Sequence, residues 1–296
     1  MQNPIQRVSL IYWEALASLR AWRNWFPLLL FWAVQGLLLW LLTALVARPS
    51  GAWLTQLLVA QFGPEAAEYP RLFLELPDLH RRLYLSLAAT LGMYCQGVSL
   101  LRLLDWHTGG KLRRESPWRR AFARWPGLVL INLALLACFL LPLAAVERLL
   151  LPSLGPGGPA RVLLLGAYGL GFVGAVFLLY APFLHVAFSS GWRRAIRESA
   201  RFARRHLGVT LVLVLVPFLF ALPVHALTLL RRVIVFGFRP ELMLHILLAS
   251  SFLTLLVLFI ELSTLVRYYA EEELRRPYEG EWDDKPELAR HYTDSG

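Results

Sequence analysis

The chain has 296 residues, of which 57% are hydrophobic and 17% are charged, whereas a soluble domain is about a quarter charged. Its mean hydropathy is +0.52, and several apolar runs approach the roughly 20 residues that cross a bilayer as a helix. These features predict an all-α, polytopic membrane helical bundle. The net charge of +10 lies beside the apolar runs, so it favours anionic lipid headgroups, and not nucleic acid, as the partner.

About six spans are expected, at residues 26–46, 83–104, 127–146, 162–188, 208–230 and 243–266. The connection 47–82 is polar and interrupted by Pro64, Pro70 and Pro77, so it is predicted to remain outside the membrane. It would form either a cap over the bundle or a lid over a cavity. Residues 271–296 are predicted to be a polar, cytoplasmic and disordered tail, which leaves residues 1–270 as a single transmembrane domain.

The spans are organised as three similar units, at about 3–104, 115–188 and 189–269. Each unit is predicted to begin with a basic amphipathic helix that lies in the membrane interface, followed by a spanning hairpin. The run Trp118-Arg119-Arg120-Ala121 recurs as Trp192-Arg193-Arg194-Ala195, and Arg124-Trp125-Pro126-Gly127 corresponds to Arg205-His206-Leu207-Gly208. These matches predict an internal repeat.

The helix expected at 189–207 has the clearest pattern. Its apolar and small stripe runs from Trp192 through Ser199 and Phe202 to Leu207, at helical spacing. We expect Trp192 and Phe202 to lie at headgroup depth and the arginines to face lipid phosphates. The residues predicted to contact headgroups in the second and third units are Arg119, Arg120, Arg124, Arg193, Arg194, Arg197, Arg201, Arg204 and Arg205.

The distribution of positive charge predicts the orientation. Lys and Arg are concentrated before the first span, at 102–124, at 189–206 and in the tail, and such loops stay on the cytoplasmic side. Both termini are therefore expected to be cytoplasmic, in a multi-pass protein of the bacterial inner membrane. The first span is expected to serve as the insertion signal in place of a cleavable signal peptide.

Residues able to perform catalysis are not indicated: the sequence has no phosphate-binding loop, GxSxG or HExxH. Cys95 and Cys138 lie within apolar spans, without a metal-ligand cluster, so neither a metal nor a cofactor is expected. Ionisable side chains within spans are the remaining candidates, because they are costly there. They are Glu261, Arg102, His185, His225 and His245.

Glu261 is the most isolated of these charges. It lies at a depth similar to that of Arg102 and His185, so we expect it to face the bundle interior and to pair with one of them. A fixed ion pair, a proton- or ion-coupling site and a hydrated interfacial site are the alternatives. His225 and His245, on adjacent spans, could meet and hold a haem, although histidines near helix ends are more often hydrogen-bonded to a neighbouring helix or hydrated at the interface.

The three units and the Trp-Arg-Arg-Ala openings resemble a loose superfamily of six-span bacterial membrane proteins. This superfamily includes the membrane domain attached to some glycerophosphodiester phosphodiesterases. The resemblance covers about residues 5–270, and it implies an inner-membrane bundle that supports lipid handling or a partner complex. The phosphodiesterase domain itself has no counterpart here, so the resemblance does not imply that activity.

Three functions are compatible with this sequence. The first is a non-enzymatic scaffold or accessory subunit that places basic helices on anionic lipid and binds a membrane-protein partner or a second copy. The second is a transporter or channel-like permease with a cavity between kinked spans, and the third is a haem-binding redox subunit. A cavity at membrane depth lined by polar groups would distinguish the transporter from the scaffold.

Overall fold

The computed structural model describes residues 4–46, 68–109, 115–146, 158–188 and 190–274, with isolated positions between 52 and 64 and at 148. All regular secondary structure in these ranges is helical, which confirms the all-α prediction. The helices are α1 (Pro4–Ala17), α2 (Trp22–Val46), α4 (Leu72–Leu87), α5 (Met93–Thr108), α6 (Pro117–Ala145), α8 (Gly158–Leu178), α9 (Ala181–Ala187), α10 (Trp192–Arg205), α11 (Leu207–Leu229), α12 (Arg231–Gly237) and α13 (Leu242–Tyr269). Shorter 3-10 and π turns are η1 (Ser18–Arg20), η4 (Ala88–Gly92) and η6 (Ala270–Leu274).

Five helical segments of the described chain are long and apolar enough to cross a membrane. They are Trp22–Ala44, Leu72–Thr108, Pro117–Ala145, Val162–Ala187 and Leu242–Leu274. A sixth consists of α10 and α11, which meet at an angle of 97°. This number agrees with a multi-pass membrane protein of about six spans.

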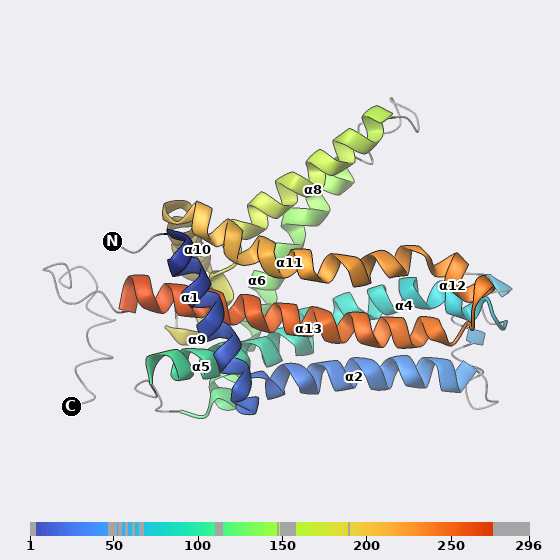
Figure 1. Ribbon diagram of the computed structural model, residues 1–296, viewed down its shortest axis with the longest axis horizontal. Helices are drawn as coiled ribbons and strands as arrows, with labels where there is room; N and C mark the ends of the chain where they lie inside the picture. Colours follow the sequence, from blue (N-terminus) through green and yellow to red (C-terminus); the bar gives the residue numbers. More distant parts are fainter. Residues whose placement is uncertain are drawn as a thin grey trace, which may run out of the picture.

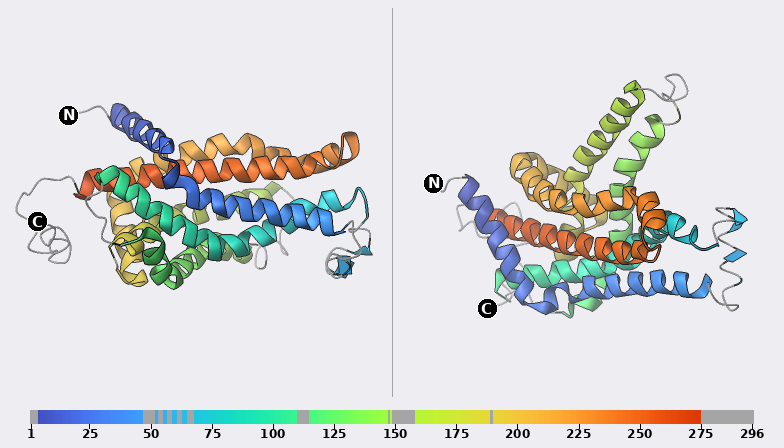
Figure 2. Two further views of the ribbon diagram at one scale, coloured as in Figure 1. Left: turned by 90° about the horizontal axis from the view of Figure 1, so that it is seen from below. Right: turned by 45° about the vertical axis from the view of Figure 1, so that its right-hand side comes forward.

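The helices form a long bundle with one divergent arm. Helices α2, α4, α5, α11 and α13 lie along the long axis, and α1 crosses α13 diagonally (Figure 1). Helices α6 and α8 pack on each other and point away from the bundle (Figure 2). The start of α1 and the end of α13 lie together at one end of the bundle, which we name the terminal end. The end of α2 and α12 lie at the opposite end (Figure 1).

Several predicted boundaries are wrong. Helix α4 begins at Leu72 and contains Pro77, so the last part of the expected 47–82 connection is helix. Most of the remainder of that connection lies outside the described residues. Helix α6 runs without interruption through Pro126, so the second predicted interfacial helix and its span are one helix. Prolines are tolerated in transmembrane helices where neighbouring groups satisfy the freed carbonyl.

The fourth span, in contrast, breaks near Pro182. Helix α8 ends at Leu178, and α9 starts two residues after the turn at Leu179, with Pro182 in its first turn, where proline is favoured. Ser199 of α10 connects the two helices: its hydroxyl donates to the Phe177 carbonyl at 2.7 Å and accepts from the Tyr180 backbone N–H at 3.2 Å. The backbone groups on both sides of the break are therefore hydrogen-bonded by a side chain of the next helix.

Ser199→Ala is expected to lower the free energy of unfolding by about 2 kcal/mol, because a buried carbonyl and a buried N–H would both lose their partner. The measurement is the midpoint of thermal unfolding of the purified protein in detergent. The matched control is Ser86→Ala on the exposed face of α4, where the change should be within about 0.5 kcal/mol. Equal midpoints for the two variants would show that Ser199 does not stabilise the break.

The terminal end contains a charged network around α1 and the last turns of α13. The side chain of Arg267 is only 4% exposed and pairs with Glu14 of α1, while Glu271 lies 4.0 Å from it. Arg7 of α1 pairs with Glu271 at 3.1 Å and with Glu272. The prediction of a disordered tail from residue 271 is therefore wrong for residues 271–274, which belong to η6. Residues 275–296 lie outside the described ranges.

Candidate functional site

A cavity of about 560 Å³ lies between α4, α12 and α13, toward the opposite end of the bundle. Its depth follows from α13: Ser250 and Thr254 lie about 12 to 18 Å along the helix from Leu242, at about 1.5 Å per residue. This is well inside the roughly 30 Å of a bilayer's hydrocarbon layer. The lining residues are Pro77, Asp78, His80, Arg81, Tyr84, Arg231, Leu247, Ser250, Ser251 and Thr254.

Two helical stripes produce this lining. On α4, Pro77, Arg81 and Tyr84 recur at the spacing of one helix face, and on α13 the same spacing joins Leu247, Ser250 and Thr254. The apolar remainder of α13 packs against α11, α2 and α1. Each helix thus presents polar side chains to the cavity, beside Pro77 of α4 and Leu247 of α13.

The charged side of the cavity is formed by Asp78, Arg81 and Arg231. Arg231, the first residue of α12, reaches α4, where its Nη1 donates to the Asp78 carboxylate at 2.6 Å and to the Leu74 carbonyl at 3.2 Å. Arg81 approaches the same carboxylate at 3.3 Å. The Asp78 and Arg231 side chains are 29% and 36% exposed, so this ion pair is partly accessible.

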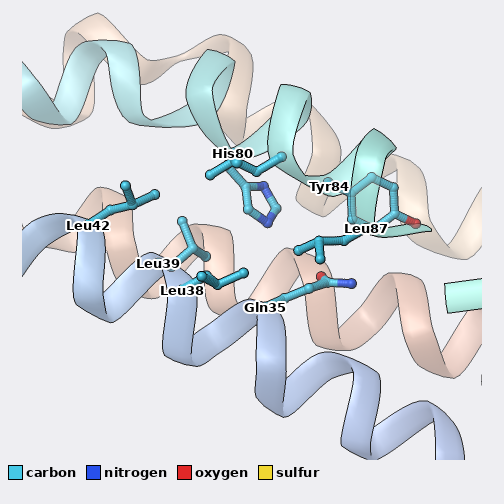
Figure 3. Close-up of a pocket in the computed structure, with 8 residues that line it drawn as sticks. Gln35, Leu38, Leu39, Leu42, His80, Tyr84 and Leu87 are labelled. Carbon is cyan, nitrogen blue, oxygen red and sulfur yellow. The ribbon is translucent and has the colours of Figure 1, made fainter. Parts of the chain in front are cut away.

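The inner wall of the cavity is formed by His80 and Tyr84. Figure 3 shows the His80 imidazole directed from α4 toward α2, near Leu39 and Gln35. His80 and Tyr84 line both the large cavity and a small one of about 10 Å³ against α2. Nε2 of His80 is buried and has no hydrogen-bond partner among the described residues. A polar group thus faces the small cavity without a protein partner.

Hydroxyl groups continue this polar surface toward the middle of the bundle. Ser250 and Ser251 are 7% and 8% exposed. Ser251 accepts a hydrogen bond from Trp32 Nε1 at 3.1 Å and donates to the Leu248 carbonyl at 2.9 Å. A second small cavity, of about 20 Å³, is bordered by Trp32, Gln35, Tyr84, Ser251 and Thr254. Leu28, Phe31, Leu255 and Leu258 complete its lining, so a few polar groups meet a mostly apolar wall there.

The predicted pairing of Glu261 is wrong. Within the described chain its carboxylate contacts neither Arg102 nor His185, and the side chain is half-buried near Tyr12. Arg102 donates to the Arg23 carbonyl and lies over the Trp118 ring at 5.6 Å. Similar depth did not imply contact, because Arg102 interacts with α2 and α6 instead.

His185 is a structural residue. It is 5% exposed, with Nδ1 at 2.6 Å from the Ser190 carbonyl and Nε2 at 3.2 Å from the Arg124 carbonyl. It therefore joins α9 to the first turns of α6 through main-chain contacts, and both ring nitrogens are occupied.

Of the two histidines proposed for a haem, the structure describes the side chain of His245 alone. His245 is exposed, and its Nδ1 lies 3.0 Å from the Glu241 carbonyl of its own helix. His225 belongs to α11, but its side chain is outside the described part of the structure. Among the described residues, no group of three or more His, Cys, Asp or Glu is placed to hold a metal ion.

The predicted headgroup residues fall into two sets. Arg120 is half-buried and donates to the Val186 carbonyl at 3.0 Å and to the Ala187 carbonyl, so it caps the end of α9. Arg124 is also half-buried. The exposed residues are Arg119, Arg193, Arg194, Arg197, Arg201, Arg204 and Arg205. Arg194 forms an ion pair with Glu198 at 2.8 Å.

The apolar stripe of α10 faces protein more than lipid. Ala195, Ser199 and Ala203 are fully buried, and Phe202 is 5% exposed, with its ring centroid 4.7 Å from that of Tyr180. Phe202 therefore belongs to the core of the terminal end and is not directed at lipid. Packing against α8 and α9 holds this helix, whatever its arginines contact.

The residues of the cavity are not predicted from the sequence. Asp78, His80 and Arg81 lie in the connection predicted to be outside the membrane, and Ser250, Ser251 and Thr254 lie in a predicted apolar span. The available signal was the placement of hydroxyl residues at i, i+1 and i+4 in α13, combined with polar residues at helical spacing after Pro77. Only the structure shows that these two stripes face each other.

Comparison with known proteins adds no further constraint. A scan against protein-family models finds none that matches the chain. Searches of curated proteins and of solved structures give no match either. The function is therefore inferred from the cavity and from the chemistry of the residues that line it.

Proposed function

We propose that this protein is a transporter or permease that binds a small polar molecule in the cavity between α4, α12 and α13. The observation that carries this proposal is the cavity itself, at membrane depth and lined by charged and hydroxyl side chains. Ligand sites of small molecules typically enclose about 300 to 1,000 Å³ and combine apolar walls with a few polar groups. The volume of about 560 Å³ falls within that range.

The composition of the lining favours transport over a purely structural role. Ionisable and polar residues are expensive in a membrane and are mostly found along substrate or ion pathways. Here they extend from the partly exposed ion pair of Asp78 and Arg231 to the buried Ser251 and Gln35. In a purely structural protein, leucine side chains could fill the same space at a lower cost in free energy. The polar lining therefore favours a ligand-binding role.

A scaffold role remains the second candidate, supported by the arm of α6 and α8. These helices pack on each other and on α5, α9 and α10 near the terminal end, while Val162, Leu165 and Leu170 are more than 60% exposed. Both proposals place the protein in a bacterial inner membrane with cytoplasmic termini. In both, the α10 arginines contact anionic lipid, because positive charge is concentrated near the span ends.

Cysteine accessibility distinguishes the two functions. In a background with Cys95 and Cys138 replaced by alanine, we expect Thr254→Cys to react with a membrane-impermeant thiol reagent, because a hydrated cavity reaches its side chain. A transporter alternates between openings, so Thr254→Cys should react both in right-side-out and in inverted vesicles.

The matched control is Ala249→Cys, which lies on the exposed surface of the same helix at similar depth but does not line the cavity. It should remain unreactive, because an impermeant reagent does not enter hydrocarbon. If Thr254→Cys does not react in either vesicle orientation, the transporter proposal is contradicted and the scaffold role is favoured. Reaction from one side only would indicate a binding site without transport.

A further inference from the structure

We infer that the ligand of the cavity carries a carboxylate or phosphate group, bound by Arg231 and Arg81. This inference rests on the proposed function and adds the charge class of the substrate. Among the described residues that line the cavity, these two arginines are accompanied by one carboxylate, that of Asp78. The ligand is thus a small anion or the anionic headgroup of a lipid, two sources that share this chemistry.

The first argument is the balance of charge. Asp78 accepts from Arg231 at 2.6 Å and lies 3.3 Å from Arg81, so its one negative charge faces two positive charges. The other lining residues are His80, Tyr84, serine, threonine, proline and leucine, which contribute no negative charge at neutral pH. The cavity therefore has a net positive charge, and a cation would first have to displace an arginine from Asp78.

The second argument is the geometry of Arg231. Both of its described hydrogen bonds, to Asp78 and to the Leu74 carbonyl, use the same nitrogen, Nη1. Among the described residues Nη2 and Nε have no partner, and a guanidinium fork matches two oxygens of a carboxylate or phosphate. Asp78 holds the fork in place from α4, so the guanidinium is positioned before the ligand arrives.

The third argument is the presence of hydroxyl groups on α13 in the same cavity as the arginines. Ser250 and Thr254 lie one helix turn apart on α13, on the same wall of the cavity. Leu247 and Pro77 provide apolar contacts near the charged side. An anion with a short polar or amphiphilic body could thus place its charge at Arg231 and the remainder along α13.

The test measures binding to the purified full-length protein in non-ionic detergent at constant ionic strength, by calorimetry. The soluble probes are glycerol 3-phosphate and citrate. The lipid probe is dihexanoyl phosphatidylglycerol below its micellar concentration, with dihexanoyl phosphatidylcholine as its zwitterionic counterpart and choline as a cation. We expect at least one anionic probe to bind, with choline showing no binding. The natural ligand is a small anion if a soluble probe binds more tightly, and a lipid headgroup if the anionic lipid does.

Two variants test the site itself. Arg231→Gln should weaken anion binding by about tenfold or more, since one charge-assisted pair is lost. Arg232→Gln is the matched control, because Arg232 is exposed and does not line the cavity. Asp78→Asn removes the competing negative charge but keeps an amide oxygen that can accept the hydrogen bond from Arg231, so Arg231 stays positioned and anion binding should become several-fold stronger. A cation site would respond in the opposite direction, so this variant remains informative even if Arg231→Gln does not fold.

The outcomes separate this inference from the proposed function. Choline binding, weaker anion binding by Asp78→Asn, or no binding of any anionic probe would overturn the anion assignment. If one of these results is obtained and Thr254→Cys still reacts from both sides, the transporter proposal stands although the anion assignment fails. Equal anion affinity of the Arg231→Gln and Arg232→Gln variants would also overturn the assignment, because binding would then lie elsewhere.

Discussion

Glu14→Gln is expected to lower the free energy of unfolding by about 2 to 3 kcal/mol. The variant leaves the Arg267 guanidinium, only 4% exposed, without its closest counter-charge, and removing one partner of a fully buried pair costs about 3 to 5 kcal/mol. The smaller value applies because the Glu14 side chain is 35% exposed and Glu271 remains 4.0 Å from Arg267. The measurement is the midpoint of thermal unfolding in detergent.

The controls for this variant compare a buried pair with an exposed one. Glu198→Gln breaks the pair with Arg194, whose side chain is 59% exposed, and should change the stability by at most about 0.5 kcal/mol. The double variant Glu14→Gln with Arg267→Met should recover part of the loss, because no buried charge then lacks a partner. If the double variant is less stable than Glu14→Gln alone, the buried guanidinium is not the source of the effect.

Gly127→Ala is expected to destabilise the protein by about 3 kcal/mol. A Cβ at this position would overlap His185 Nε2 and would lie 2.7 Å from its Cε1. His185 cannot yield easily, since it is 5% exposed and contacts the Ser190 and Arg124 carbonyls. Overpacking of this kind costs about 1 to 3 kcal/mol, and displacement of the ring adds the loss of buried hydrogen bonds.

Gly208 provides the matched control for Gly127. It was predicted to occupy the corresponding position of the third unit, yet a Cβ there would meet nothing within 4 Å. Gly208→Ala should therefore be neutral, or stabilising by up to about 1 kcal/mol through helix propensity. Combining Gly127→Ala with His185→Ala should cost less than the sum of the two single changes. An additive result would indicate that Gly127 and His185 do not interact.

The sequence predicted the helical spans because each depends on a local property, a long apolar run. It placed α2, α8 and α13 close to their observed starts, and the break near Pro182 follows from the geometry of proline. The start of α4 was missed for a physical reason. Asp78, His80 and Arg81 resemble a loop, because a polar helix face is stable in a membrane only where it lines a cavity or contacts protein.

The contacts of the candidate site depend on distant segments and could not be read from spacing. Arg231 and Asp78 are separated by more than one hundred and fifty positions, and nothing local identifies one as the partner of the other. Arg267 was interpreted as the residue at which the last span leaves the membrane. It is instead buried, because Glu14 from the other end of the chain neutralises it.

The position of Glu14 beneath Arg267 has a consequence for biosynthesis. The two residues are 253 positions apart, so α1 leaves the ribosome long before its partners on α13 exist. At about 5 to 20 residues per second, translation of the intervening chain takes on the order of 13 to 50 s. During that interval α1 has no Arg267, Glu271 or Glu272 to bind, and its docking across α13 must be a late event in assembly. Helix α1 is thus made long before α13, yet it reaches its final place only after α13 has been made.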